Sequence, residues 1–261
     1  MVMSILDKIV LDKKEEVSAK KRMFDLDFFQ RSPLFNREIH SLAEGIRKKS
    51  GIIAEFKRRS PSRQIINQSS SILEVVKGYE QAGVSGISVL TDTKYFGGAL
   101  DDLILVRSAV GIPLLRKEFI VDSYQIYESK AYGADVVLLI SAILSPGQIA
   151  DFSQLAKELK MEVLLEIHNE EELSKSNLNH IDLVGVNNRN LKTFTVDLET
   201  SGQLAKLIPD QKVKVSESGI SETETIRELK KHGYQGFLMG ENFMKTEFPG
   251  KAAELFIKDL G

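Results

Sequence analysis

From residue 51 to the end of the chain, the hydrophobic positions follow two patterns in regular alternation. Short runs that are apolar almost throughout are typical of parallel strands covered on both faces. They predict strands at Ile52–Phe56, Gly86–Leu90, Pro113–Arg116, Val136–Ile140, Glu162–Ile167, Leu183–Asn187, Val213–Glu217 and Phe237–Met239. Apolar residues at helical spacing predict helices between them, at about 71–82, 100–109, 122–132, 146–159, 169–175, 197–206, 221–232 and 248–259.

Consecutive strand–helix units of this kind are typical of a (β/α)8 TIM barrel, an α/β fold with parallel strands inside and helices outside. A doubly wound open sheet is the alternative that the same alternation allows. The segment before the first strand has a helical pattern, with Ser4 and Ser41 as N-caps and residues 25–33 as a connector. About 50 residues are too few for a robust separate core. We therefore expect one domain over residues 1–261, with residues 1–50 as an N-terminal helical cap.

Composition limits the functions that remain open. A chain of 261 residues with 42% hydrophobic content can bury the core of one barrel. Its formal charge of −2 gives no general attraction to nucleic acid. The longest apolar stretch, residues 136–144, is far shorter than the roughly 20 residues of a membrane span. A small-molecule substrate is therefore the expected partner, with no role for nucleic acid or membrane.

Cysteine and histidine usage restricts the chemistry further. The chain has no cysteine, which excludes disulfides and thiolate catalysis and suits a reducing compartment. Its 4 histidines include no pair at close metal-binding spacing. We expect a cytoplasmic protein without a metal site; the oligomeric state stays open, and a monomer is plausible.

Charged and polar residues gather at the carboxyl ends of the predicted strands, where barrels of this type place their active sites. The set is Glu55, Lys57, Lys117, Glu166, Asn187, Arg189 and Glu217. Because side chains alternate along a strand, Lys117 shares a face with Leu115, whereas Arg116 and Glu118 point the other way. Any one of these residues could be a solvated charge or part of a structural ion pair. Agreement among several strand ends instead predicts an acid/base site.

Two turns that follow the last two strands contain small residues, Ser218-Gly219 and Gly240-Glu241. Glycine lets a ligand approach the backbone closely, and many barrels hold a phosphate group at this place. Ordinary turn glycines are the alternative, but the two turns together predict phosphate binding. His168 follows the fifth strand, and we expect a structural or rim role for it.

Several parts of the sequence combine these residues with characteristic neighbours. They are residues 53–57 with 60–62, 88–92 with 95–98, 114–120, 162–166, 185–191, 216–220 and 239–241. In this order they resemble the indole-3-glycerol-phosphate synthase family. The resemblance covers nearly the whole chain, including the N-terminal helical segment.

The resemblance implies a carboxy-lyase of tryptophan biosynthesis that works without a cofactor. Its reaction converts 1-(2-carboxyphenylamino)-1-deoxyribulose 5-phosphate to indole-3-glycerol phosphate, carbon dioxide and water. By similarity, Lys117 is the general acid for the ribulose carbonyl, and Glu166 is an acid/base for the dehydration and stabilises cationic intermediates. Lys57 and Glu55 would bind substrate and share in proton transfer.

The same resemblance implies how the substrate lies in the site. Asn187, Arg189 and Glu217 would hold its carboxylate and hydroxyl region. Ser218, Gly219 and Gly240 would receive the phosphate, with Lys57 on one flank. Ser60 and Glu241 are further expected substrate- or phosphate-binding residues. The apolar residues Phe96, Phe119, Ile140 and Leu191 are candidates to line the aromatic end of the substrate, and packing at the top of the barrel is an equal alternative for each.

Three other functions remain open from the residues. A barrel that binds sugar phosphate without catalysis would need the two turns but not the acid/base set. An aldolase-type enzyme would form a Schiff base on Lys57 or Lys117, because a lysine at a strand end can serve either chemistry. The sugar-phosphate isomerase of the same pathway is a third alternative, but it lacks the array of lysines and Glu166.

Overall fold

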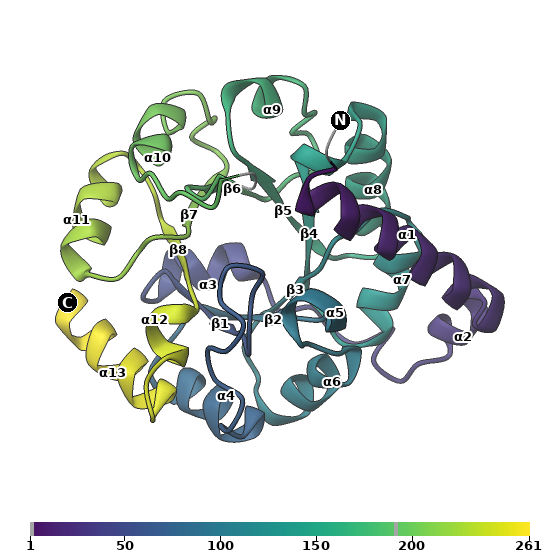
Figure 1. Cartoon of the computed structure of the whole chain (residues 1–261), viewed down its shortest axis with the longest axis horizontal. Coiled ribbons are helices and arrows are strands. Elements are labelled where there is room, and N and C mark those ends of the chain that lie inside the picture. Colours follow the sequence, from purple (N-terminus) through teal and green to yellow (C-terminus); the bar gives the residue numbers. More distant parts are fainter. Residues whose placement is uncertain (1–2, 191–192) are drawn as a thin grey trace.

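The computed structural model describes residues 3–190 and 193–261. Among these residues, eight parallel strands form a closed barrel in chain order, and the last strand pairs with the first (Figure 1). The strands are β1 (Ile52–Phe56), β2 (Gly86–Leu90), β3 (Leu114–Lys117), β4 (Val136–Ile140), β5 (Glu162–Ile167), β6 (Leu183–Asn187), β7 (Val213–Glu217) and β8 (Gly236–Met239). The closed barrel confirms the predicted (β/α)8 fold and rules out the open sheet.

Helices surround the barrel on its outside (Figure 1). They are α1 (Ile5–Met23), α2 (Leu26–Gln30), α3 (Leu42–Lys48), α4 (Ile72–Gln81), α5 (Thr93–Phe96), α6 (Leu100–Ala109), α7 (Tyr124–Ala131), the 3₁₀ helix η1 (Ser141–Ile143), α8 (Pro146–Glu158), α9 (Glu170–Ser174), α10 (Glu199–Leu204), α11 (Thr223–Lys231), α12 (Glu241–Met244) and α13 (Pro249–Leu260). In the described part of the chain, every helix is too short or too polar to cross a bilayer.

Most boundaries follow the sequence pattern, and the differences have local causes. β3 lies one residue further along the chain than predicted, and β8 begins one residue earlier. The expectation of a plain connector before α3 is wrong, because Asp25 accepts a hydrogen bond from the Phe28 N–H at 2.8 Å and starts α2. Near the carboxyl end of the chain, α11 begins after Glu222, two residues later than the predicted helix, and its N-cap makes no side-chain hydrogen bond.

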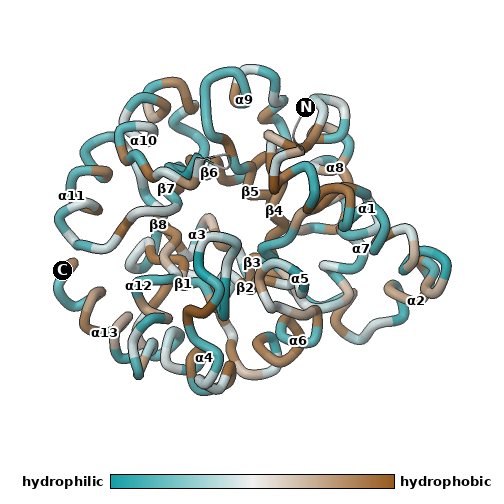
Figure 2. The backbone as a smooth tube through the Cα atoms, in the orientation of Figure 1, coloured by the Kyte–Doolittle hydropathy of each residue, from teal (hydrophilic) through white to brown (hydrophobic). Residues whose placement is uncertain are grey.

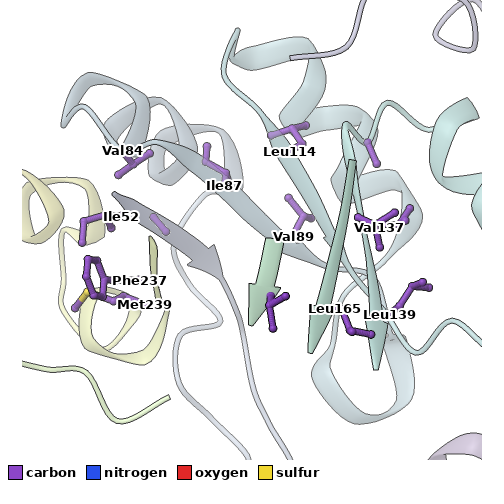
Figure 3. Packing of buried hydrophobic residues seen from close by; sticks show 14 of the residues in the cluster. Ile52, Val84, Ile87, Val89, Leu114, Val137, Leu139, Leu165, Phe237 and Met239 are labelled. Atoms are coloured by element: carbon purple, nitrogen blue, oxygen red, sulfur yellow. The ribbon is translucent and has the colours of Figure 1, made fainter. Parts of the chain in front are cut away.

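Two apolar layers follow from the alternation of side chains along the strands. Outward-facing residues such as Ile52, Val89 and Leu139 pack between the barrel and the helices (Figure 3). Inward-facing residues such as Leu115 and Leu164 fill the barrel itself. Figure 2 shows the resulting distribution, with hydrophobic strands at the centre and hydrophilic stretches on the surrounding helices.

The N-terminal end of the barrel is closed by α3. Leu42 and Ile46 of this helix belong to the same apolar cluster as the barrel interior. The carboxylate of Glu162, at the start of β5, accepts hydrogen bonds from the Leu42 N–H at 2.8 Å, the Ala43 N–H at 3.0 Å and the Ser41 hydroxyl at 2.5 Å. A negative charge at a helix N-terminus satisfies N–H groups that lack partners within the helix. The closed floor leaves the opposite end of the barrel free for a site.

At that opposite end, α1 lies along the rim and is held there by a buried lysine. The ammonium of Lys13 is 3.0 Å from Asp92, which follows β2, and 3.1 Å from Glu118, which follows β3. The side chain of Lys13 is only 3% exposed. Burial alone would lower the pKa of Lys13, but the carboxylates of Glu118 and Asp92 outweigh it and raise that pKa. The ion pairs therefore fix α1 against two neighbouring strand ends.

Replacing Lys13 with methionine leaves Asp92 and Glu118 buried without this cation. We expect Lys13→Met to lower the free energy of unfolding by about 3 kcal/mol, because removing one partner of a buried ion pair costs about 3–5 kcal/mol. Urea denaturation followed by circular dichroism measures the difference. The exposed neighbour Lys14 provides the control, and Lys14→Met should change stability by less than about 0.5 kcal/mol. Equal and small effects of the two substitutions would contradict this role of Lys13.

Candidate active site

A cavity of about 390 Å³ opens at the carboxyl ends of the strands. It is lined by the predicted site residues Glu55, Lys57, Ser60, Phe96, Lys117, Phe119, Ile140, Glu166, Asn187, Arg189, Glu217, Ser218, Gly219, Gly240 and Glu241. Leu191, which was also predicted, lies outside the described residues. The barrel thus brings together side chains that are up to about 190 positions apart in sequence.

The centre of the cavity is an ammonium group between two carboxylates. Nζ of Lys117 is 2.6 Å from Oε2 of Glu166 and 2.7 Å from Oε2 of Glu217. These residues end β3, β5 and β7, and their side chains point inward as the alternation of each strand predicts. Burial alone would lower the pKa of Lys117, but the charges of Glu166 and Glu217 dominate and raise it. Lys117 is therefore a protonated donor at neutral pH.

The two carboxylates share one ammonium and have opposite pKa shifts. Burial would raise the pKa of Glu166, but Lys117 and His168 lower it to about 2, and Asn187 also donates a hydrogen bond to Glu166. Burial, together with the charges of Glu166 and Glu55, raises the pKa of Glu217 to about 7 against the pull of Lys117. Oε1 of Glu217 is buried without a hydrogen-bond partner. Glu166 is thus the ionised member, and Glu217 can hold a proton near neutral pH.

A second ion pair lies at the end of β1. Nζ of Lys57 is 2.8 Å from Oε1 of Glu55, and the hydroxyl of Ser88 on β2 donates to Oε2 of Glu55 at 3.2 Å. Gly240 makes room for this pair, because a Cβ there would lie 2.9 Å from Oε1 of Glu55. The site therefore contains two lysines, each paired with acidic groups.

The turn after β7 has a strained backbone. Ser218 has a φ of +69°, which is unusual for a residue with a side chain, and Gly219 follows with a φ of +82°. This conformation directs the Ser218 hydroxyl to Oδ1 of Asn187, to which it donates at 2.9 Å. On the neighbouring β6, Gly185 leaves space for Glu217, since a Cβ would lie 2.2 Å from Oε1 of that residue. A backbone strained like that of Ser218 is typical of functional sites.

The wall on the side of β2 and β3 is aromatic and apolar. The rings of Phe96 and Phe119 lie 5.9 Å apart at an angle of 41°. Ile5, Leu6 and Ile9 of α1 border the same cavity, and the analysis of strand ends missed them. Their apolar spacing indicated a helix face that needs a partner, but no local signal indicates which part of the barrel that face covers.

Not every charge near the rim belongs to the cavity. Arg116 points away from it and pairs with Glu128 at 2.7 Å, as the alternation along β3 predicts. Glu241 lines the cavity, but Oε1 of its carboxylate pairs with Arg63 at 2.5 Å. A carboxylate repels phosphate, so the Glu241 side chain is better placed to hold the loop after β1 than to bind an anion. Among the described residues, no group of three or more His, Cys, Asp or Glu could hold a metal ion.

Fold and site together define a (β/α)8-barrel enzyme with a lysine–carboxylate centre, an apolar wall and a strained turn after β7. A family model described as indole-3-glycerol phosphate synthase matches residues 6–256. The chain belongs to the indole-3-glycerol phosphate synthase family.

Curated relatives agree with this assignment, and a solved structure shares the fold. The chain is 45% identical over 260 residues to the indole-3-glycerol phosphate synthase of Bacteroides thetaiotaomicron, covering 98% of each protein. It is 40% identical over 256 residues to that of Legionella pneumophila, covering 98% of this chain and 99% of the relative. A solved 3-hexulose-6-phosphate synthase matches at a TM-score of 0.62 and 15% identity, over 80% of this chain and 99% of the other. That likeness concerns the fold alone.

The raised pKa of Glu217 makes stability depend on pH. The pKa of Glu217 is about 7 in the folded protein, above its ordinary value of 4.5, so protonation of this carboxyl stabilises the folded state. This stabilisation is fully present below pH 4.5 and is lost as the pH rises through 7. Glu217→Gln cannot ionise, and its amide oxygen can still accept from Lys117. We expect the Tm of the variant relative to wild type to be higher at pH 8 than at pH 5 by roughly 5 °C. Calorimetry measures both Tm values. A difference between variant and wild type that is the same at pH 5 and pH 8 would contradict the raised pKa of Glu217.

Proposed function

We propose that this chain is an indole-3-glycerol phosphate synthase that acts through noncovalent acid/base catalysis. The substrate is 1-(2-carboxyphenylamino)-1-deoxyribulose 5-phosphate, and the products are indole-3-glycerol phosphate, carbon dioxide and water. The observation that carries the proposal is the protonated Lys117 held between Glu166 and Glu217 inside the cavity. Family membership over residues 6–256 supports the same reaction.

In the first step, the aryl carbon that bears the carboxylate attacks the ribulose carbonyl carbon. Lys117 donates a proton to the carbonyl oxygen as the new carbon–carbon bond forms, which prevents the build-up of an alkoxide. Carbon dioxide then leaves, and the electrons of the broken bond restore the aromatic ring. A lysine with a raised pKa suits this step because it is fully protonated at neutral pH.

In the second step, the hydroxyl formed at the former carbonyl carbon leaves as water. Glu166 stabilises the cationic intermediates through its negative charge and serves as the acid/base of the dehydration. Glu55 and Lys57 lie at 2.8 Å from one another and share in the proton transfer. The hydroxyl takes up one proton as its carbon–oxygen bond breaks, and the neighbouring methylene carbon loses one proton as the carbon–carbon double bond of the indole ring forms, so this step needs no net proton.

The two ends of the cavity match the two ends of the substrate. The phosphate end consists of Lys57 with the backbone and hydroxyl groups of Ser60, Ser218, Gly219, Gly240 and Glu241. Asn187 and Arg189 would hold the carboxylate and hydroxyl region beside Glu217. The aromatic ring would lie against Phe96, Phe119 and Ile140, with Leu191 as a further predicted contact.

Schiff-base chemistry is less suited to this site. An amine must lose its proton before it can attack a carbonyl carbon. Glu166 and Glu217 raise the pKa of Lys117, which disfavours the neutral amine. Borohydride trapping of a lysine–substrate adduct would overturn noncovalent catalysis.

Three broader features belong to the same proposal. We infer a cytoplasmic location from the absence of cysteine in a chain of 261 residues. The formal charge of −2 supports a small sugar phosphate as the partner rather than nucleic acid. Contacts of α1 and α3 with the barrel support one domain, with residues 1–50 as its N-terminal cap, and a monomer remains our working assumption.

Removal of either central charge should abolish turnover while leaving most of the binding intact. We expect Lys117→Met and Glu166→Gln each to lower kcat by at least about 100-fold, because general acid/base groups contribute about 10²–10⁴-fold to rate. Indole fluorescence of the product measures the rate, and the exposed sites Lys231 and Glu222 provide the controls Lys231→Met and Glu222→Gln. Losses confined to KM would reject these roles. Tight phosphate binding by wild-type protein without any turnover would reject the enzyme altogether.

A negative charge in the turn after β7 should act on binding instead. Ser218→Asp places a carboxylate beside the expected phosphate position, so we expect KM to rise by roughly tenfold or more from like-charge repulsion. The measurement is the same fluorescence assay over a range of substrate concentrations. Ser218→Asn is the matched variant without the charge. A KM for Ser218→Asp equal to that of Ser218→Asn would place the phosphate elsewhere.

A further inference from the structure

His168 lies directly behind Glu166 and has a carboxylate at each ring nitrogen. The ring nitrogen Nδ1 is 3.1 Å from Oε2 of Glu172, and the same oxygen accepts a hydrogen bond from the backbone N–H of His168 at 2.9 Å. Nε2 is 3.6 Å from Oε1 of Glu166, is buried and has no hydrogen-bond partner. The His168 side chain is 12% exposed. The ring is thus held by α9 and directed at the carboxylate of Glu166.

This arrangement suits only the charged form of the ring. A neutral imidazole has one N–H and one lone pair, so one of its nitrogens would face a carboxylate with a lone pair. With Nδ1–H donated to Glu172, that lone pair would face Glu166. The imidazolium has an N–H on each nitrogen and so presents one to each carboxylate. At 3.6 Å, the contact between Nε2 and Oε1 of Glu166 is ionic and too long for a hydrogen bond.

The charges around the ring agree with this geometry. Three acidic residues act on the ring: Glu166 on β5, Glu172 on α9 and Glu217 on β7. The cation Lys117 on β3 contacts Oε2 of Glu166, the oxygen that does not face the ring. Burial would lower the pKa of His168, but the three carboxylates outweigh it and raise the pKa above its ordinary value of 6.5. His168 does not line the substrate cavity, so it can act on the reaction only through another residue.

We propose that His168 is a positioning residue: as an imidazolium anchored by Glu172, it holds the carboxylate of Glu166 oriented toward Lys117. This rests on the proposed function, in which Glu166 is the acid/base of the dehydration. When the ring loses its proton, the Nε2 lone pair repels Oε1 of Glu166 and the catalytic carboxylate loses one of its two cations. Turnover should therefore fall as the pH rises through the pKa of His168.

Nuclear magnetic resonance tests the electrostatic part without reference to activity. The chain has 4 histidines, so the imidazole signals can be assigned by replacing one residue at a time. We expect His168 to titrate above 6.5, and Glu172→Gln and Glu166→Gln each to lower that pKa because each removes a facing carboxylate. A pKa at or below 6.5 that neither substitution changes would overturn the proposal.

Kinetics test the effect on the reaction. We expect wild-type kcat/KM, which reports pKa values of the free enzyme, to fall at high pH with a pKa equal to the one measured for His168, and Glu172→Gln to lower both values together. Burial raises the pKa of Glu217 to about 7, but among the described residues no hydrogen bond joins Glu217 to Glu172, so a joint shift identifies His168. His168→Asn should lose this limb and lower kcat at pH 6 by about tenfold, because a catalytic carboxylate held out of its productive orientation reacts more slowly, with KM nearly unchanged.

His180, which is exposed, supplies the control His180→Asn, for which we expect a wild-type profile. An unchanged limb in His168→Asn, or a loss confined to KM, would overturn the positioning role. If His168→Asn fails to fold, the joint shift in Glu172→Gln decides the question. If the wild-type protein does not turn over the substrate, the proposed function fails, while the resonance titration still decides whether His168 and Glu166 are coupled.

Discussion

The site depends on one buried interaction, the ammonium of Lys117 between the carboxylates of Glu166 and Glu217. Buried charges are tolerated only when they are paired, and three strands of a closed barrel supply the three partners. Closure brings every strand's carboxyl end to one rim, so β3, β5 and β7 can meet although helices separate them in sequence. The same pairing keeps Lys117 protonated and makes the pKa values of the two carboxylates diverge.

Further ion pairs extend from this centre to the surrounding elements. His168 and Glu172 connect Glu166 to α9, while Lys13 connects α1 to the strand ends beside Lys117. These contacts involve buried or largely buried groups, where solvent screens charge weakly. These outer charge pairs therefore hold α1 and α9 against the rim of the barrel, and the cavity within the rim stays open to a substrate.

The sequence was a good guide to the direction of side chains along the strands. Alternation along β3 correctly separated Lys117, which faces the cavity, from Arg116, which faces α7. Short elements were harder, because α2 is marked in the sequence only by Asp25, which accepts a capping hydrogen bond from the Phe28 N–H. Its five residues are too few to distinguish a helix from a turn by pattern.

By itself, the sequence determined the order of strands and helices and the residues that point into the barrel, because both follow from periodicities of two and 3.6 residues. Only the tertiary structure decided which charges meet. Lys13 finds Glu118, and Arg63 finds Glu241, across long stretches of chain. The imidazole of His168, expected at a structural or rim position, lies against Glu166. Such contacts and the pKa shifts that they cause depend on distances and burial in three dimensions, which no local pattern contains.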